Sequence, residues 1–332
     1  MHYPSVTPAV FLSRPNRFVA QVLLQGEETT VHVKNTGRCR ELLLPGVPVW
    51  LTPGQNPGRK TAWDLIAVQK GGRLINLDAA APNAVFGEYA RAGLFLPETE
   101  AVRPEVRFGA SRFDFQLQAG GGTHFVEVKG VTLEQAGQNF FPDAPTQRGV
   151  KHLQELIRAR QQGYGAHVVF VIQLAEARAF SPNDRTDPTF GATLRQATEE
   201  HVRKAIAGYG VALDLTLRDI QGKMKKAGQP WEKAKGFDNS CPLSGFIPVA
   251  EFNGDPQATP LGLTVNGEVR QQGTTADMIH KIVPLIAYMS KFFTLKAGDV
   301  VLTGTPEGVG PLASGDELVV NFNGHSLTTR VL

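Results

Sequence analysis

The sequence predicts a multi-domain α+β protein of three segments, with boundaries near residues 80 and 190 of its 332 residues. Residues 1–80 show short strands separated by turns, the pattern of a small β-barrel. After Pro82, helices alternate with strands, which predicts an α/β domain with a mixed sheet over residues 81–190. A third segment covers residues 191–332, and the total length fits two or three domains.

Composition excludes several classes of protein. Hydrophobic residues make up 42% of the chain and charged residues 20%, so we expect a packed core and no general disorder. Cys39 and Cys241 lie far apart, which excludes a disulfide scaffold and a cysteine zinc site. No apolar run approaches the ~20 residues of a membrane-spanning helix, and the N-terminus lacks the pattern of a signal peptide. We therefore expect a soluble, cytoplasmic protein with no membrane partner.

The N-terminal segment is predicted to form an OB-like barrel, a common platform for nucleic acid. Its five candidate strands are Arg17–Leu24, Thr30–Lys34, Val47–Thr52, Trp63–Gln69 and Arg73–Leu77. Basic residues between positions 31 and 73 outnumber acidic ones; they are Lys34, Arg38, Arg40, Arg59, Lys60, Lys70 and Arg73. Such a patch suits the phosphates of a nucleic acid, whereas its charge taken alone favours an ordinary solvated surface.

The middle segment is predicted to run helix, three strands, helix, strand. In order, these elements are a helix at Asn83–Ala92, a strand near Val106, strands at Arg112–Leu117 and Thr123–Lys129, a helix at Gln147–Gln162 and a strand at Ala166–Gln173. Gly93 and Gly163 follow the two helices, as expected for residues that end them.

A hairpin in this segment carries the most informative residues. In SRFDFQLQAGGGTHFVEVKG, two alternating runs flank a glycine-rich centre, which predicts a two-residue turn at Gly120-Gly121. In that register Asp114 lies opposite Glu127. The other face would pair Phe113 with Val128 and Phe115 with Val126. Two carboxylates directly opposite each other repel and destabilise a hairpin, whereas a divalent cation such as Mg²⁺ or Mn²⁺ between them would remove that cost.

Other charged residues extend this hypothesis. Lys129 lies on the same face as Glu127, where it could orient a water or stabilise phosphate charge. Glu88 lies on the helix that comes before the hairpin in the sequence. The alternative is an exposed salt bridge from Glu127 to Lys129 or Arg112. On the next helix, Arg148, Lys151 and Glu155 either line the site and grip a phosphate or form a solvated face. His152 is expected to be structural or solvated.

These residues resemble a known family. NTGRCRELLLPG, NPGRK, APNAVFGE, SRFDF, FVEVKGVTL, FPDAPTQRGVKHLQEL and DPTFG together are similar to the sugar fermentation stimulation (SfsA) family over residues ~10–190. The resemblance implies an OB-like domain joined to a nuclease-like domain of the PD-(D/E)xK class, and a protein that binds DNA as a nuclease or as a regulator of sugar metabolism, with RNA as another ligand. It places Asp114, Glu127 and Lys129 in the nuclease motif, with Glu88 as a further acidic member.

The C-terminal segment resembles a second family. GATLRQATEEHVRKAIAGYGVALDLTLRDIQ and LKAGDVVLTGTPEGVGPL are similar to the fumarylacetoacetate hydrolase (FAH) family over residues 191–332. The resemblance implies part of a mixed β-roll, with Mg²⁺ held by one Asp and two Glu. Asp214 matches the metal-binding Asp. Four residues match substrate positions: Arg218, Gln221, Lys235 and Thr305. We expect helices at Glu199–Ala207, up to Lys226 and at Thr275–Phe292, with strands at Gly208–Asp214 and toward Leu332.

This second site is predicted to be incomplete. The two metal-binding Glu of the family lie upstream of the point where the resemblance begins, and Glu98–Glu100, the one Glu-x-Glu of the chain, lies in the other segment. One carboxylate does not make a Mg²⁺ site. Both resemblances stop near Gly191 with a piece of each fold missing, which suggests a chimeric gene, natural or an artefact. Missing strands would expose apolar surface and favour aggregation or a homodimer.

Three functions remain open at this stage. The preferred one is a metal-dependent nuclease that binds DNA. The first alternative is an FAH-type hydrolase, decarboxylase or isomerase of diketo acids such as acylpyruvates or oxaloacetate, which the missing Glu residues argue against. The second alternative is a DNA-binding regulator that does not cut.

Overall fold

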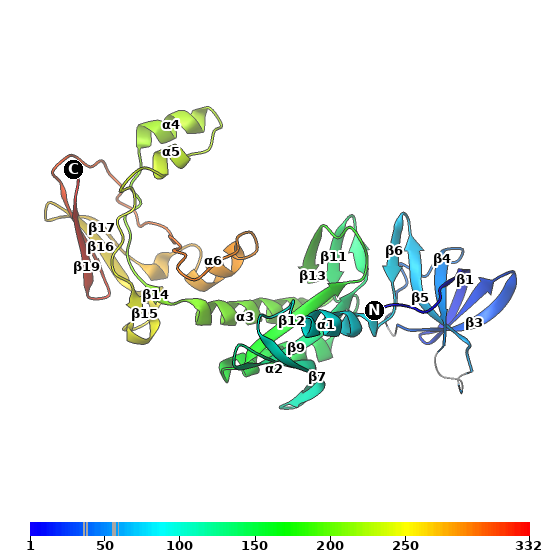
Figure 1. Cartoon of the computed structure of the whole chain (residues 1–332). Helices are drawn as coiled ribbons and strands as arrows, with labels where there is room; N and C mark the ends of the chain where they lie inside the picture. The colour runs from blue at the N-terminus through cyan, green and yellow to red at the C-terminus, as the bar shows by residue number, and fades with distance from the viewer. Residues whose placement is uncertain (36, 38, 55–57, 59) are drawn as a thin grey trace. The chain divides into compact units, whose positions relative to one another are not determined.

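The computed structural model describes the chain except for residues 36, 38, 55–57 and 59. It divides into two compact units, Met1–Glu200 and His201–Leu332, coloured from blue to green and from green to red in Figure 1. The change of unit falls inside helix α3 (Pro188–Ala205), so the expected boundary at residue 191 lies within this helix. Phe190 and Leu194 pack in the core of the first unit, and Val202 and Ile206 in that of the second.

The N-terminal part is a closed five-stranded barrel, as predicted. Its strands, with one further strand that extends the sheet, are β1 (Thr7–Asn16), β2 (Val19–Leu24), β3 (Glu27–Val33), β4 (Pro48–Pro53), β5 (Trp63–Lys70) and β6 (Arg73–Asn76). The strand order is β3-β2-β1-β4-β5-β6, and a parallel pairing of β3 with β5 closes the barrel. Closure protects strand edges that would otherwise be free to pair with another chain.

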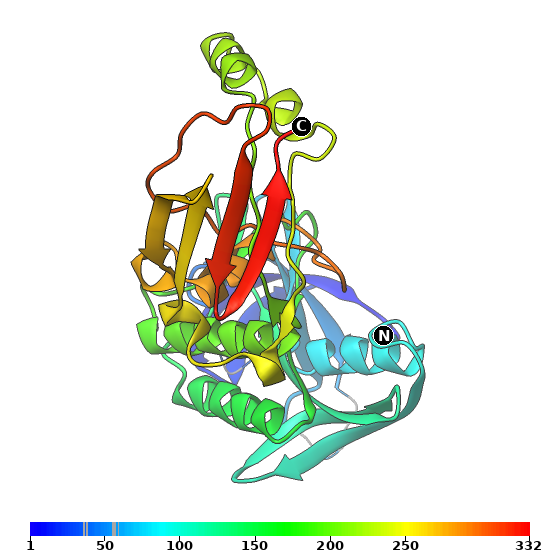
Figure 2. The same cartoon turned by 90° about the vertical axis from the view of Figure 1, so that its left-hand side faces the viewer.

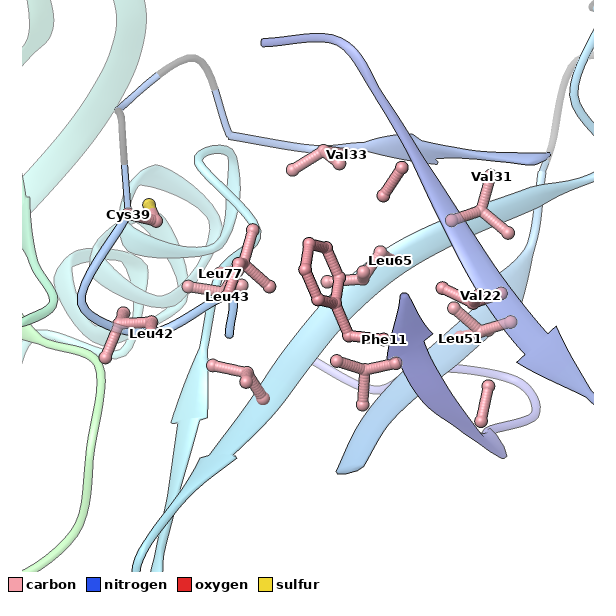
Figure 3. Close-up of a cluster of buried hydrophobic side chains, with 14 of the residues drawn as sticks. Phe11, Val22, Val31, Val33, Cys39, Leu42, Leu43, Leu51, Leu65 and Leu77 are labelled. Carbon is pink, nitrogen blue, oxygen red and sulfur yellow. The ribbon is translucent and has the colours of Figure 1, made fainter. Parts of the chain in front are cut away.

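The predicted membership of the barrel was wrong by one strand. The prediction omitted β1 and counted β6, whereas β6 lies beyond β5 at the end of the strand order, outside the closed ring. Pro8 and Pro15 lie within β1 and weaken its strand pattern in the sequence. Phe11 of this strand nevertheless lies at the centre of the barrel core, 1% exposed, among side chains from β2 to β5 and from the segment that holds Leu42 and Leu43 (Figure 3).

The rest of the first unit is a mixed sheet with a helix on each face. Its main elements are α1 (Ala81–Arg91), β7 (Thr99–Phe108), β8 (Ser111–Ala119), β9 (Gly122–Val131), α2 (Gln147–Gln161) and β12 (Gly165–Ile172). The strand order is β12-β9-β8-β7, with only β12 and β9 parallel. Phe86 of α1 packs on one face with Phe115 and Val126, and Leu153 of α2 on the other with Phe125. A separate small sheet contains β10 (Leu133–Gln135), β11 (Gln138–Phe141) and β13 (Ala179–Pro182).

The β8–β9 hairpin has the predicted register. Gly120 and Gly121 have φ angles of +55° and +72°, which a two-residue turn of this kind requires. Phe115 faces Val126 as expected, but the ladder ends at that pair. Beyond it, the Asp114 side chain accepts the hydrogen bond of the Val128 backbone N–H. The strands separate there, so the predicted pairing of Phe113 with Val128 was wrong, and Phe113 packs on the α2 face instead.

The second unit is built on a four-stranded antiparallel sheet of order β17-β16-β18-β19, seen in yellow and red in Figure 2. These strands are β16 (Pro260–Val265), β17 (Glu268–Thr274), β18 (Glu317–Phe322) and β19 (His325–Arg330). The other elements are β14 (Gly208–Tyr209), α4 (Arg218–Lys226), α5 (Glu232–Lys235), β15 (Ile247–Pro248), the 3₁₀ turns η1 (Val249–Glu251), η2 (Pro256–Ala258) and η3 (Thr275–Asp277), and α6 (Ile282–Met289).

Two predicted elements of this unit are shorter than expected. The strand expected at Gly208–Asp214 is reduced to β14. The long helix expected at Thr275–Phe292 is split into η3 and α6. Pro284 has no N–H to donate and falls in the first turn of α6, where a helix tolerates proline. The chain on either side of the break is bound by the side chain of Gln257. Its amide donates to the Thr275 carbonyl at 2.6 Å, and its oxygen accepts from the Ile282 N–H at 2.7 Å. None of the helices in the described residues is long and apolar enough to cross a membrane.

Candidate metal and nucleic-acid site

Strands β8 and β9 and helix α2 bring four ionisable side chains together. Asp114 lies where the hairpin ladder ends, and Glu127 and Lys129 lie on β9. Helix α2 adds His152, whose Nδ1 is hydrogen-bonded to Glu127 Oε1. Thr146 caps the start of α2 by accepting from the Gly149 N–H at 3.0 Å, which fixes the helix near the strands. Three predicted residues and one unpredicted residue therefore form a single site.

Asp114 is held by two neutral donors. Its Oδ2 accepts from the Val128 N–H at 2.7 Å, and its Oδ1 accepts from the Asn83 side-chain amide of α1 at 2.9 Å. Burial and the negative charge of Glu127 nevertheless raise the pKa of the Asp114 carboxyl above its ordinary value. The repulsion expected between the two carboxylates is thus present.

Glu127 is more deeply buried than Asp114, and other groups compensate its negative charge. Its Oε1 accepts from Lys129 Nζ at 2.5 Å as well as from His152. Burial alone would raise the pKa of the Glu127 carboxyl, but the hydrogen bond from His152 and the charge of Lys129 outweigh burial and lower the pKa. Among the described residues, no donor reaches the buried Oε2 of Glu127. One oxygen is therefore saturated and the other is open.

The site fits a divalent cation in its donor chemistry. A buried carboxylate oxygen without a hydrogen-bond partner destabilises the fold. Carboxylate oxygens are also the ligands that hard divalent cations prefer. Asp114 and Glu127 would supply two protein oxygens, and Mg²⁺ keeps several waters at such sites. Within the described ranges no cluster of three or more His, Cys, Asp or Glu side chains has metal-binding geometry, so further ligands would come from backbone or water.

Glu88 lies apart from this network. Its carboxylate is paired with the amino group of Met1 at 2.5 Å, and its side chain is 58% exposed. The structure thus gives Glu88 a different partner from the other three predicted catalytic residues.

The predicted nucleic-acid residues fall into three groups. Lys34 is paired at 2.7 Å with the buried Asp78, where the barrel joins α1, so its charge is already compensated. Four others are exposed: Arg40 and Lys60 next to the barrel, and Arg148 and Lys151 on α2. Arg38 and Arg59 lie outside the described residues.

The barrel also exposes an aromatic residue that the sequence reasoning missed. Phe18, in the turn between β1 and β2, is 52% exposed, and the Arg17 guanidinium lies 5.5 Å from its ring centre. The Arg14 side chain donates to the carbonyls of Arg17 and Asn35, each at 2.8 Å, which ties this turn to the segment that leads to Arg40. An exposed ring beside cations suits base stacking.

The C-terminal residues form a different and weaker arrangement. Asp214 is paired with Lys235 at 2.5 Å, and Lys235 also donates to Thr216 at 2.8 Å. Arg218 donates to Gln221 at 2.9 Å, and Thr305 accepts from Gln271 at 3.2 Å. The Asp214 side chain is 49% exposed, and among the described residues it belongs to no metal-binding cluster of three or more His, Cys, Asp or Glu side chains. This donor set does not fit a Mg²⁺ ion.

The two parts of the chain match models of different families. Residues 12–77 match the SfsA N-terminal OB domain, and residues 80–214 match the sugar fermentation stimulation protein RE domain. Residues 189–332 match the C-terminal model of fumarylacetoacetate hydrolase. The matches overlap at residues 189–214, and the predicted resemblance to these two families is confirmed.

Individual relatives agree with this division. A sugar fermentation stimulation protein homolog from Desulfitobacterium hafniense is 53% identical over 203 residues, 61% of this chain and 89% of the relative. The structure of Pyrococcus furiosus SfsA in complex with Ca²⁺ is 30% identical, with a TM-score of 0.56 over 60% of this chain and 87% of that chain. The oxaloacetate tautomerase YcgM from Escherichia coli is 90% identical over 142 residues, 43% of this chain, which spans only 65% of that relative.

The opposite pKa directions of the two carboxyls predict opposite effects on stability. Because its pKa is raised in the folded protein, the ionised Asp114 carboxyl destabilises the fold at neutral pH. This effect disappears as the pH falls toward the pKa of the carboxyl in the unfolded chain, near 3.8. Asp114→Asn should therefore raise the melting temperature at pH 7 in EDTA by roughly one to three degrees. Glu127→Gln should lower it, because the lowered pKa of Glu127 stabilises the fold above about 4.5, and Lys129 and His152 lose their anionic partner.

Thermal unfolding followed by circular dichroism between pH 4 and 8 checks both signs. The gain from Asp114→Asn should shrink as pH falls, since the wild-type carboxyl then becomes neutral as well. A stabilising effect of both substitutions would show that charge repulsion alone governs the site and that Lys129 and His152 do not compensate Glu127.

Proposed function

Because the chain belongs to the sugar fermentation stimulation protein family through residues 12–214, we propose that this part binds DNA and cleaves its phosphodiester bonds with the help of a divalent cation. The class proposed is the PD-(D/E)xK nucleases, with Asp114, Glu127 and Lys129 as the motif. The main sheet and its two helices follow the order α1, β7, β8, β9, α2, β12, with β10 and β11 of the small sheet inserted before α2, and this order supports the assignment. We further propose domains over residues 1–80, 81–190 and 191–332.

The observation that carries the proposal is the open oxygen of Glu127 beside Asp114. Both carboxylates would hold the cation, Mg²⁺ or Mn²⁺, through oxygen atoms at the end of the hairpin. When bound, such an ion supplies an activated water and neutralises phosphate charge. A Ca²⁺ complex is known for the Pyrococcus furiosus relative, which supports a divalent cation without fixing its identity.

Side chains and backbone groups of the protein would bind the phosphate and hold the carboxylates in place. Lys129 has a side chain 15% exposed and three donors, so Nζ can reach a phosphate oxygen while β9 keeps it beside Glu127. A cation placed there stabilises the charge that develops on phosphorus oxygens. Asn83 and the Val128 N–H keep Asp114 in place during this step. Glu88 is proposed to contribute less, since Met1 occupies its carboxylate.

Substrate binding is assigned to the exposed basic residues. Arg40 and Lys60 of the barrel region and Arg148 and Lys151 of α2 would contact phosphates, which position the nucleic acid but do not read its sequence. Phe18 would stack on an unpaired base, which favours single-stranded over fully paired substrates. RNA has the same phosphates and bases and remains a second proposed ligand.

A regulator that binds DNA without cutting is the competing proposal. It would use the same basic residues, and Asp114, Glu127 and Lys129 would then have no effect beyond stability. Cleavage that requires a divalent cation and the two carboxylates separates the two proposals.

We propose that the C-terminal unit lacks the hydrolase, decarboxylase or tautomerase activity of FAH-type proteins. Its resemblance to the tautomerase supports binding of a carboxylate by Arg218 or Lys235. However, the Asp214 carboxylate is neutralised by Lys235 and belongs to no metal-binding cluster of three or more His, Cys, Asp or Glu side chains among the described residues. A homodimer through this unit is a further proposal, supported by exposed apolar residues such as Ile279 and Phe292, 93% and 66% exposed.

If the first unit is a nuclease, substitutions in its metal site should abolish DNA cleavage while DNA binding is retained. Asp114→Asn and Glu127→Gln should abolish Mg²⁺- or Mn²⁺-dependent cleavage, because each removes a carboxylate from the metal site. Lys129→Ala should slow cleavage by about 100-fold or more, because it removes one donor to the phosphate. Time courses on plasmid and single-stranded DNA, with filter binding of the same variants, measure both properties.

Gln154→Ala is the matched control, since Gln154 is exposed on α2 and lies outside the site. Full cleavage by Glu127→Gln would reject the metal site and favour the regulator.

The binding residues predict two distinguishable effects. Neutralising Arg38, Arg40, Arg59 and Lys60 should flatten the dependence of log K on log salt by ~0.7–0.9 for each phosphate that the variant no longer binds. Phe18→Ala should weaken binding of oligo(dT) by about tenfold at an unchanged slope, because stacking involves no phosphate. Fluorescence anisotropy at several salt concentrations measures both, and an unchanged slope in the quadruple variant would leave these cations as ordinary surface charges.

We expect the C-terminal unit to be inactive toward the substrates of FAH-type proteins. The full chain with Mg²⁺ should not accelerate the tautomerisation of oxaloacetate or the hydrolysis of acylpyruvates above the buffer rate, measured by ultraviolet absorbance. Turnover that disappears in Asp214→Asn and without Mg²⁺ would show that the missing ligands come from another source.

A further inference from the structure

The donors around Glu127 are distributed unequally between its two oxygens. Oε1 accepts from Lys129 Nζ and from His152 Nδ1, whereas no donor among the described residues reaches the buried Oε2. The two donors also differ in mobility. The Lys129 ammonium ends a flexible four-carbon chain, while the His152 ring is 6% exposed and packs edge-on against Phe113, with ring centres 6.2 Å apart. His152 is therefore the stationary partner of the carboxylate.

The Arg148 side chain indicates which nitrogen of His152 carries the proton. Arg148 Nε lies 3.5 Å from His152 Nε2, one helical turn away on α2. Because a guanidinium has no acceptor, Nε2 accepts in this contact, and the proton of the neutral ring lies on Nδ1. Nδ1 can then donate to Glu127. Arg148 and His152 thus form a chain of hydrogen bonds from the helix surface that ends at the accepting carboxylate of Glu127.

We propose that His152 is a positioning residue, which holds Glu127 Oε1 so that Oε2 faces the divalent cation and Lys129 is free to contact the substrate. This inference rests on the proposed metal site and adds a role to a residue outside the Asp114, Glu127 and Lys129 motif. Hydrogen bonds to a ligating carboxylate fix its orientation, and their loss typically reduces metal affinity by about 10- to 100-fold.

Mn²⁺ affinity, measured by calorimetry on the full chain without DNA, tests the role independently of cleavage. His152→Leu removes the donor and should weaken Mn²⁺ binding about tenfold or more. His152→Asn places an amide N–H near the position of Nδ1 and should keep the affinity within about threefold of wild type. His152→Gln places its amide near Nε2 instead and should behave like His152→Leu. Gln154→Ala, on the exposed face of the same helix, should bind Mn²⁺ as wild type does.

Wild-type affinity in a folded His152→Leu variant would overturn the proposal. If His152→Leu does not fold, the comparison of Asn with Gln decides the matter, and equal affinities in those two variants overturn it. Asp114→Asn and Glu127→Gln belong in the same titration. If they too bind Mn²⁺ like wild type, the metal site itself is wrong, whereas if only they fail to bind, the site is right and the positioning role of His152 is wrong.

Discussion

A carboxylate buried as deeply as Glu127 is tolerated only where donors and cations compensate its charge. Lys129 and His152 do so at one oxygen, whereas no donor among the described residues reaches the other oxygen. The neighbouring Asp114 is hydrogen-bonded to two neutral donors, the Val128 N–H and the Asn83 amide. Three elements of the first unit meet at this carboxylate. The hairpin ladder ends at Phe115, where Asp114 accepts from the Val128 N–H, and α2, which begins after its cap at Thr146, brings His152 to β9.

Local signals were sufficient to predict the hairpin and the register of its paired part. Two glycines that must adopt positive φ fix the turn, and the ladder follows the predicted register as far as the Phe115–Val126 pair. Beyond that pair the register does not hold, and Asp114 instead accepts the Val128 N–H. His152 could not be found in this way, because its partner is 25 residues away and only the docking of α2 brings them together. The spacing of Arg148 and His152, four residues apart on a predicted helix, was the one signal in the sequence.

The errors in the predicted fold share the same cause. Strand β1 has two prolines, and it is recognised only when β2 and β4 are seen to pair with it. The helix expected over Thr275–Phe292 contains Pro284, which disfavours a continuous helix, and the distant Gln257 side chain satisfies the backbone at its interruption. Phe113 changes face because Asp114 replaces a backbone partner. In each case an interaction distant in sequence outweighs the local preference.

The candidate site of the first unit is more complete than that of the second unit, so a catalytic role is supported for the first unit alone. The first unit combines an unpaired buried oxygen with neighbouring charges, whereas Asp214 in the second is half exposed and neutralised by Lys235. The most direct test of the account is a crystal of the full chain soaked in Mn²⁺, with the metal located by anomalous scattering. The account predicts a peak within bonding distance of an Asp114 oxygen and of Glu127 Oε2. A fully occupied Mn²⁺ elsewhere in the first unit, with neither carboxylate bound, would contradict it.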